Sequence, residues 1–244
     1  MYSIATRNYQ QLHKKQMAMG PWLAYQSWRN IIFLHWAFDP SSILPLIPTH
    51  PGICLDTYED KAWVSLLAFE VSGARLKGLP AIPGLSSFNE LQLRTYIKDG
   101  NRPATISLNV SVDHSLIYLL YKAMGIPAGK DRLAHNCQNG VYNLHAHLKN
   151  RSLVDIKWEL PEADHIATPL ESWLTERYCS CRSSGGQLYR HPVCHFPLSI
   201  KPLAILPETV YCRLDNGTIL SKNNILLSHY SSGTDALFVK KERM

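Results

Sequence analysis

The sequence lacks the short motifs that mark the commonest catalytic and nucleotide-binding sites. Its 244 residues contain no GxGxxG, no Walker-type glycine loop, no GxSxG and no HExxH. Each of these motifs brings the groups that its chemistry needs into one turn or helix. Their absence removes the sequence support for a dinucleotide-binding fold, a P-loop NTPase, a serine hydrolase with a nucleophile elbow and a zincin protease. No cofactor is predicted.

Long apolar runs are also absent. A membrane-spanning helix needs ~20 consecutive apolar residues, and the run from Ile31 to Leu34 ends at His35. The first residues carry charges and glutamines where a signal peptide would have its apolar region. We therefore expect no membrane partner, a flexible N-terminal tail over residues 1–20, and a cytoplasmic protein.

Charge of one sign is not concentrated in any segment. The formal net charge of +6 arises from Lys and Arg residues scattered in ones and twos, with clusters only at Lys14-Lys15 and Lys240-Lys241. No basic stripe with interleaved aromatic residues is present for a phosphate backbone to follow, so nucleic acid is not a predicted partner. Hydrophobic residues are 45% and charged residues 18%, which is typical of a globular protein with a packed core.

The cysteines show no CxxC pair and no spacing typical of zinc, so reduced thiols are expected. Two groups of residues provide a metal-binding alternative. His145 and His147 alternate on a predicted strand, and His191, Cys194 and His195 are close in sequence. Both residue types are common ligands of zinc and iron, but neither spacing is diagnostic, and no metal site is predicted.

What the sequence does contain is a succession of short apolar or alternating runs between turn signals. This pattern is typical of strands rather than helices. The predicted strands are Ala62 to Val71, Leu91 to Lys98, Ala104 to Val112, Val141 to Leu148, Leu153 to Leu160, and a hairpin of Arg177 to Cys181 with Gln187 to His191. The fold class is therefore mainly β.

Two short helices are predicted. One follows Asp113 and places Leu116, Ile117, Leu120, Tyr121 and Met124 on one apolar face. The other follows the capping box formed by Thr168 and Glu171. The run from Leu76 to Leu85 holds two Gly and two Pro, and it is predicted to be an ordered loop on the body of the protein. No linker divides residues 21–244, which are predicted to form one domain.

The order of motifs along the chain resembles that of the YqjF-like family, a domain of unknown function. The first half contributes Trp28, Phe33 to Trp36, Leu44 to Pro48, Leu55 to Tyr58, Ala62 to Val64, Gly78 to Pro80, Pro83 to Ser86, Glu90-Leu91 and Arg94 to Tyr96. The second half contributes Leu174 to Cys179, Leu188 to Arg190 and His195 to Leu198. The resemblance covers roughly residues 22 to 240, and it implies a fold similar to acetoacetate decarboxylase, in which an antiparallel sheet closes into a barrel or cone with few helices.

The same resemblance directs attention to Lys130, because acetoacetate decarboxylase uses a lysine Schiff base activated by a neighbouring cation. Lys130 follows the predicted helix at the position nearest to the decarboxylase lysines. Here, however, Asp131 stands where the activating cation is expected, and a carboxylate would raise the pKa of the lysine. A solvated loop lysine is the favoured interpretation of Lys130.

Glu90 and Arg94 are four residues apart on one predicted strand and therefore share a face. Glu90 resembles a decarboxylase glutamate that faces the cavity, and Arg94 is suited to bidentate binding of a carboxylate. Either the two side chains contact a ligand or they form a buried structural ion pair. The further candidate ligand-binding residues are Trp36, Tyr96, Arg177 and His195, with Trp28 and Tyr178 as additional aromatic boundaries.

Three functions are left open. The leading hypothesis is a domain that binds a small organic molecule, either carboxylate-bearing or apolar, in a central barrel cavity. The second is a decarboxylase-like or hydratase-like enzyme acting on a keto or organic acid. The third is a protein-interaction module using the Leu76 to Leu85 loop and exposed edge strands. Assembly into a homo-oligomer is a further expectation that the sequence leaves open.

Overall fold

A computed structural model describes residues 21–124, 126, 128–148, 152–162, 164–184 and 186–244. The proposed N-terminal tail, residues 1–20, lies outside the described residues. Strands dominate the fold, which confirms the mainly β prediction. None of the helices in the described part of the chain is long and apolar enough to cross a membrane.

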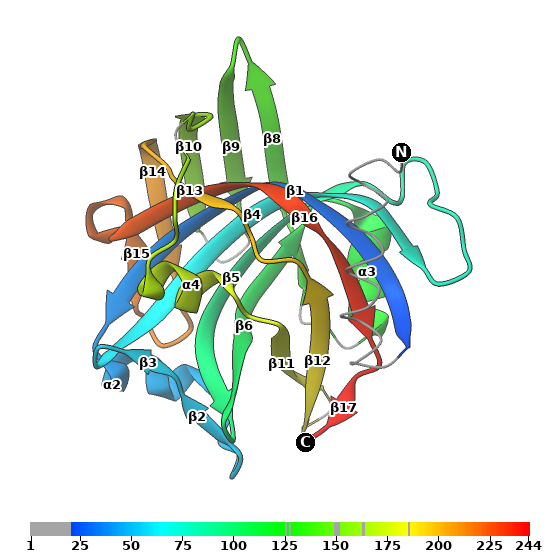
Figure 1. The fold of residues 1–244 in the computed structure, drawn as a ribbon, viewed down its shortest axis with the longest axis vertical. Coiled ribbons are helices and arrows are strands. Elements are labelled where there is room, and N and C mark those ends of the chain that lie inside the picture. The colour runs from blue at the N-terminus through cyan, green and yellow to red at the C-terminus, as the bar shows by residue number, and fades with distance from the viewer. Residues whose placement is uncertain (1–20, 125, 127, 149–151, 163, 185) are drawn as a thin grey trace.

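Seven strands close into a barrel (Figure 1). They are β1 (Trp22–Phe38), β4 (Lys61–Leu76), β5 (Phe88–Asp99), β6 (Arg102–Val112), β11 (Cys179–Ser184), β12 (Gln187–His195) and β16 (Leu227–Val239). Their order is β16-β1-β4-β5-β6-β11-β12, and pairing of β12 with β16 completes the ring. All of these neighbours are antiparallel except β6 and β11, which pair in parallel.

Short strands extend the barrel sheet, and a second sheet packs against its outer face. The short strands are β2 (Ile53–Leu55), β3 (Thr57–Tyr58), β7 (Ala128–Lys130), β13 (Ile200–Pro202) and β17 (Glu242–Arg243). The second sheet consists of β8 (Arg132–Gln138), β9 (Val141–His147), β10 (Leu153–Glu159), β14 (Ile205–Arg213) and β15 (Ile219–Ser221). The helices are α2 (Pro40–Ile43), α3 (Ser115–Ala123) and α4 (Pro169–Thr175), with 3-10 turns η1 (Leu44–Leu46) and η2 (Lys222–Asn224).

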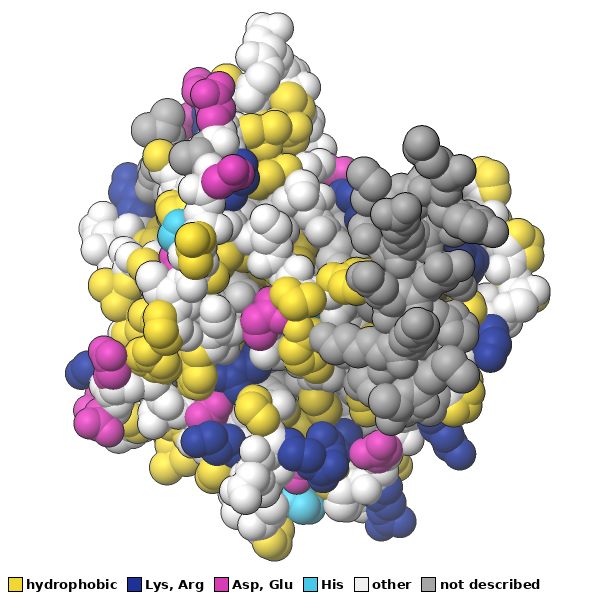
Figure 2. Space-filling view, viewed as in Figure 1, with side chains coloured by type: hydrophobic (Ala, Val, Ile, Leu, Met, Phe, Trp, Pro, Cys, Tyr) yellow, Lys and Arg dark blue, Asp and Glu magenta, His cyan; other side chains and the backbone are white. Residues whose placement is uncertain are grey.

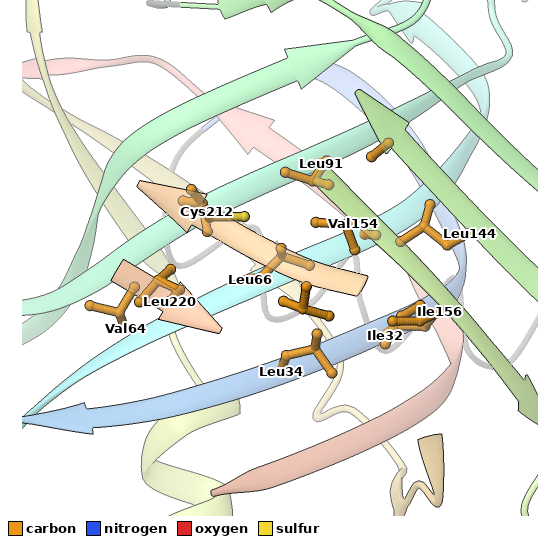
Figure 3. Close-up of a cluster of buried hydrophobic side chains, with 14 of the residues drawn as sticks. Ile32, Leu34, Val64, Leu66, Leu91, Leu144, Val154, Ile156, Cys212 and Leu220 are labelled. Atoms are coloured by element: carbon orange, nitrogen blue, oxygen red, sulfur yellow. The ribbon is translucent and has the colours of Figure 1, made fainter. Parts of the chain in front are cut away.

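The largest apolar core lies between the outer face of the barrel and the second sheet. Figure 3 shows side chains from both sheets meeting there. They include Ile32, Leu34, Val64, Leu66 and Leu91 from the barrel, and Leu144, Val154, Ile156, Cys212 and Leu220 from the second sheet. Because strand residues alternate between faces, this core occupies every second residue of the barrel strands and leaves the others facing inward.

The predicted strands are confirmed with small changes of their ends. The hairpin is also confirmed, although β11 begins at Cys179 rather than at Arg177. Strands β1 and β16 were not predicted. Their pairing brings the backbones very close, because a Cβ atom on Gly233 would lie 1.9 Å from the carbonyl oxygen of Trp28. Glycine is therefore required at this crossing.

Both predicted helices are present. Helix α4 has the predicted capping box of Thr168 and Glu171. Helix α3 is capped by His114, since Asp113 instead accepts hydrogen bonds from the backbone and side-chain nitrogens of Asn89, at 2.9 and 2.7 Å. The predicted apolar face of α3 is only partly buried. Its buried members are Ile117 and Tyr121, whereas Leu116, Leu120 and Met124 are exposed.

The middle of the Leu76 to Leu85 loop is ordered by its own turns, whereas its ends contact the body of the protein: the backbone N–H of Lys77 donates to Leu23, and Leu85 packs against an apolar core cluster. The backbone N–H of Leu79 donates to Leu76, and that of Leu85 donates to Ile82. Leu76, Leu79 and Ile82 are all more than half exposed, which corrects the expectation of packing for this part of the loop, whereas Leu85 packs as expected. The two glycines at positive φ, Gly78 and Gly84, turn the chain outward.

On the face of the molecule in Figure 2, Lys and Arg side chains are dispersed around the lower part and do not form one continuous stripe.

Candidate functional site

A pocket of about 60 Å³ lies inside the barrel. Its lining side chains come from β1, β4, β5, α4 and β12 and from the segments that follow α4 and β12. They are Trp28, Ile31, Phe33, Leu67, Phe69, Gln92, Arg94, Thr175, Arg177, His195 and Leu198. One water needs ~10–15 Å³ of such space, so this interior pocket has room for a ligand of a few non-hydrogen atoms.

Arg94 lies on the wall of the interior pocket. Its Nη2 donates to the carbonyl oxygen of Leu174 at 3.0 Å, while its Nε is buried and has no hydrogen-bond partner among the described residues. Leu174 is in the last turn of α4, where carbonyl oxygens have no partner within the helix. In the described part of the chain, no carboxylate forms an ion pair with Arg94. The guanidinium is thus positioned by a helix end and retains a donor for a ligand.

Arg177 brings a second guanidinium to the same pocket. Its Nη1 donates to Asp56 at 2.8 Å and its Nε donates to the carbonyl of Trp173 at 2.8 Å. Its Nη2 is buried and has no partner among the residues that the structure describes. The guanidinium carbons of Arg177 and Arg94 are 5.0 and 5.7 Å from the ring centre of Tyr96. Tyr96 therefore lies beneath two converging cations, as a cation–π partner of each.

Glu90 shares the inward face with Arg94, as predicted, but the two do not pair. The carboxylate of Glu90 accepts hydrogen bonds from Gln92 and from the hydroxyl of Tyr121, the latter at 2.8 Å. Burial raises the pKa of Glu90, although these two hydrogen bonds and the positive charge of Arg182 oppose the rise. The proposed Glu90–Arg94 ion pair is therefore wrong. Glu90 is separated from the pocket by Gln92, which itself lines it.

His195 closes another side of the interior pocket and is fixed by aromatic contacts. Its ring centre lies 4.6 Å from that of Tyr178 and 5.7 Å from that of Trp28. Its Nδ1 donates to the carbonyl oxygen of Phe196 at 2.6 Å. Tyr178 in turn donates its hydroxyl to Glu176. The structure thus brings together four predicted side chains, those of Arg94, Arg177, His195 and Trp28, around one pocket.

A buried polar chain that sequence reasoning did not find supports Arg94. The Nδ1 of His35 is 2.6 Å from the hydroxyl of Ser65, which is 2.5 Å from the hydroxyl of Tyr96. Tyr96 donates to the same carbonyl of Leu174 that accepts from Arg94. Burial lowers the pKa of His35 well below its usual range, and the electrostatic influence of the neighbouring His229 and Arg94 adds to this effect. His35 is therefore neutral at physiological pH.

Glu171 lies between the buried polar side chains around His35 and the N-terminal cap of α4. One oxygen accepts from the backbone N–H of Thr168 at 2.7 Å and lies 2.8 Å from His165, and the other lies 2.8 Å from His229. Burial alone would raise the pKa of Glu171, but these hydrogen bonds outweigh it and lower the pKa to about 2. The rings of His229 and His35 are 5.2 Å apart. The pairing of β1 with β16, which no local pattern indicates, brings them together.

Trp36 lies on the opposite side of the barrel wall. Its ring is buried in the core between the two sheets, and its Nε1 donates to the carbonyl oxygen of Ser221 at 3.0 Å. On β1, the adjacent residue His35 faces inward instead. Trp36 is therefore not brought together with Glu90 and Arg94, which corrects the expectation that it bounds their cavity.

Lys130 is not part of the interior pocket. It is exposed on β7, next to Val112 of β6, and it does not line the pocket. The neighbouring Asp131 accepts a hydrogen bond from Ser111 at 2.6 Å. Every lysine among the described residues is at least partly exposed. A Schiff-base lysine needs a desolvated amine, and the described part of the chain places none in the barrel interior.

The residues of the metal-binding alternative are divided between different surroundings. Cys194 is buried in an apolar cluster with Leu237, on the face of β12 opposite His195. The Nδ1 of His145 lies 3.0 Å from a carboxylate oxygen of Asp155. No group of three or more His, Cys, Asp or Glu side chains able to hold a metal occurs in the portion of the chain that the structure describes. All six cysteines are free thiols.

A closed, mainly antiparallel barrel whose interior combines apolar side chains with buried polar groups defines the structural class. The structure is similar to an acetoacetate decarboxylase-like enzyme from Sphingomonas wittichii RW1, with a TM-score of 0.61 and 13% identity, covering 91% of this chain and 92% of that chain. It is also similar to acetoacetate decarboxylase from Legionella pneumophila, with a TM-score of 0.61 and 10% identity, covering 92% and 88%. The enduracididine biosynthesis enzyme MppR complexed with pyruvate gives a TM-score of 0.64 and 11% identity, covering 91% and 90%. These similarities show the fold and confirm its prediction.

Residues 25–235 match the family of uncharacterized conserved proteins designated DUF2071, and the chain belongs to this family. Over 224 residues it is 28% identical to the uncharacterized protein YqjF of Bacillus subtilis (strain 168), which covers 90% of this chain and 91% of that protein. The resemblance drawn from the sequence motifs is therefore confirmed.

Proposed function

We propose that the interior pocket binds a small carboxylate, such as a short 2-oxo acid, with Arg94 and Arg177 as the residues that hold the carboxylate group. The single observation that carries this proposal is the unpaired guanidinium of Arg94. A buried charge without a partner costs free energy, and an arginine fork is well matched to a carboxylate. A bound anion would compensate the charge of Arg94 and satisfy its buried Nε.

The composition of the pocket favours the same class of ligand. The two guanidinium groups and Gln92 supply hydrogen-bond donors, while Phe33, Leu67 and other apolar side chains form the remaining wall. A carboxylate with a short apolar or carbonyl-bearing end fits this division. The volume of about 60 Å³ favours a compound the size of pyruvate over a larger one. Among proteins of the same fold, MppR has been observed in complex with pyruvate.

The test is a titration of the protein with pyruvate, followed by calorimetry or ligand-detected NMR, for the native chain and for Arg94→Met. A hydrogen bond to a charged group contributes ~1.5–3 kcal/mol, so Arg94→Met is expected to weaken binding by about 10-fold to 100-fold. Arg132→Met, on the exposed surface of β8, is the matched control and retains native affinity. Pyruvamide, which lacks the charge, should bind poorly to all three proteins.

Equal affinity of the native protein and Arg94→Met would contradict this role of Arg94, and absence of saturable binding would contradict the choice of ligand class. Addition of borohydride to the pyruvate complex separates binding from Schiff-base catalysis. We expect no covalent adduct by mass spectrometry, because all described lysines are at least partly exposed. An adduct on any lysine would instead support the decarboxylase-like alternative.

A further inference from the structure

A second and larger cavity lies outside the barrel interior. Its volume is about 290 Å³, near the lower limit of typical small-molecule pockets at ~300 Å³. Its walls come from β5, β6 and β11, from the 3-10 turn η1, and from the end of β14 and the residues that follow it. None of the three functions considered for the barrel uses this outer cavity.

The course of the strands explains the position of the cavity. Strands β6 and β11 pair in parallel at Thr105–Ser180 and Ile106–Cys181. Beyond this point, Ser107 and Asn109 of β6 and Arg182 of β11 line the outer cavity instead of continuing the ladder. A β-bulge in the pairing of β5 with β6 falls at the same level, around Leu108. The parallel junction is thus the place where the barrel wall is interrupted.

Arg182 is the polar side chain whose surroundings indicate that this cavity binds a ligand. Its Nε is buried and has no hydrogen-bond partner among the described residues. Burial lowers the pKa of Arg182, and the nearby Glu90 and Tyr121 oppose this effect. The carboxylate of Glu90, however, already accepts from Gln92 and Tyr121. In the described part of the chain, no carboxylate forms an ion pair with Arg182, so this residue, which lies between the barrel interior and the outer cavity that it lines, has a buried donor unused.

The other lining residues of the outer cavity indicate the chemistry of the uncharged part of the ligand. Leu46, Leu93, Leu108 and Leu214 supply apolar surface. Arg213 and Asp215, which also line the cavity, are exposed and lie toward solvent. The cavity therefore combines a buried cation with apolar walls, which is the chemistry that recognises a carboxylate attached to a hydrocarbon chain.

We propose that the outer cavity is a second binding site, specific for a medium-chain monocarboxylate, in which Arg182 holds the carboxylate and the leucine side chains contact the hydrocarbon chain. This site is independent of the small-carboxylate site in the barrel interior, because the two cavities share no lining residue among those that the structure describes. The two proposals differ in the arginine they require and in the length of ligand they accept.

Octanoate is the probe for the test, because its chain is too long for a pocket of about 60 Å³. Calorimetric titration of the native protein is expected to show saturable binding. Arg182→Met should weaken it at least 10-fold, as expected for loss of a hydrogen bond of ~1.5–3 kcal/mol to a charged group. Arg94→Met should leave octanoate affinity unchanged. Pyruvate binding should instead be weakened in Arg94→Met and unchanged in Arg182→Met. Octanamide, the uncharged analogue, should bind at least 10-fold more weakly than octanoate.

Leu108→Trp provides a second test that preserves the charge. The larger side chain fills the cavity next to Arg182 and should abolish octanoate binding while pyruvate binding persists. Thermal unfolding of each variant checks that it is folded. The proposal is overturned if the native protein does not bind octanoate, or if octanoate binding is lost in Arg94→Met and retained in Arg182→Met and Leu108→Trp. The pyruvate titration decides the interior site separately, so failure of one proposal is distinguishable from failure of the other.

Discussion

The two faces of strand β5 have different compositions and different roles. Leu91 and Leu93 face the second sheet and are buried in an apolar core that both sheets complete. Glu90, Gln92 and Arg94, which alternate with them, face the barrel interior, where hydrogen bonds of Arg94 remain unmade. The outer face therefore resembles an ordinary protein core, whereas the inner face retains polar groups that do not optimise the stability of the unliganded fold. Such a difference along one strand is expected where one face stabilises the protein and the other binds a ligand.

Adjacent substitutions on β5 test this comparison most directly. Leu91→Ala should lower the free energy of unfolding by ~2–5 kcal/mol, because it removes fully buried methyl groups and leaves a cavity. Arg94→Met should change it by less than ~1 kcal/mol or should stabilise the protein, since an apolar side chain replaces a charge without an ion-pair partner. Urea denaturation of both variants measures the two values. A loss for Arg94→Met as large as that for Leu91→Ala would make Arg94 a structural residue.

The same alternation explains how much of the site was predictable. Period two placed Glu90 and Arg94 on one face correctly, because β5 has polar and apolar residues in regular order. The rule did not help on β1, where residues 31–36 are buried on both faces, so the sequence could not show that His35 rather than Trp36 faces inward. The partner of Arg177 is Asp56, 121 residues earlier in the chain. That contact depends on the closure of the whole barrel.

The fold was predictable to a similar degree. Regular alternation identified the central strands, and the capping box identified α4. Strand β16 was missed because its sequence, LSHYSSGTDALFV, contains Ser and Gly residues that are typical of turns. The parallel junction of β6 with β11, which produces the outer cavity, depends on contacts between distant segments. Arg182 therefore carries no local signal of its role, in contrast to Arg94, which family motifs and strand periodicity both indicate.

Acid pH should lower the free energy of unfolding, and a buried histidine of the inner face should account for part of this loss. Burial holds His35 neutral by lowering its pKa in the folded protein, while in the unfolded chain the pKa is ~6.5. The unfolded state therefore binds more protons below pH ~6.5, and stability falls by up to ~1.4 kcal/mol per pH unit for this histidine. His35→Asn, which retains a partner for Ser65 in place of Nδ1, should reduce this slope between pH 6.5 and 5.

Denaturation curves at several pH values measure this slope, and Leu91→Ala is the control. That variant removes no titrating group, so its stability should be lower by a similar amount at every pH, with the native slope. An unchanged slope in His35→Asn would show that the buried ring does not carry the acid sensitivity. His191, whose pKa burial and the charges of Arg182 and Lys241 lower to about 4, would then be the next residue to replace.

Glu90→Gln should give the smallest effect and the opposite sign. Burial raises the pKa of Glu90 in the folded protein, so its ionisation costs stability as the pH rises above the unfolded value of ~4.3 and through the folded value. The variant should therefore be more stable than the native protein at pH 7, by up to ~1 kcal/mol, and this advantage should diminish toward pH 4.5. The Gln side chain still accepts from the hydroxyl of Tyr121.

Equal losses at pH 4.5 and pH 7 would contradict this expectation, because they would mean that Glu90 acts through packing or hydrogen bonds independent of its charge. A loss that grows with pH would instead make ionised Glu90 a necessary partner of Arg182. In that case Arg182 would have a partner within the protein, and the difference between the two faces of β5 would extend only to Arg94.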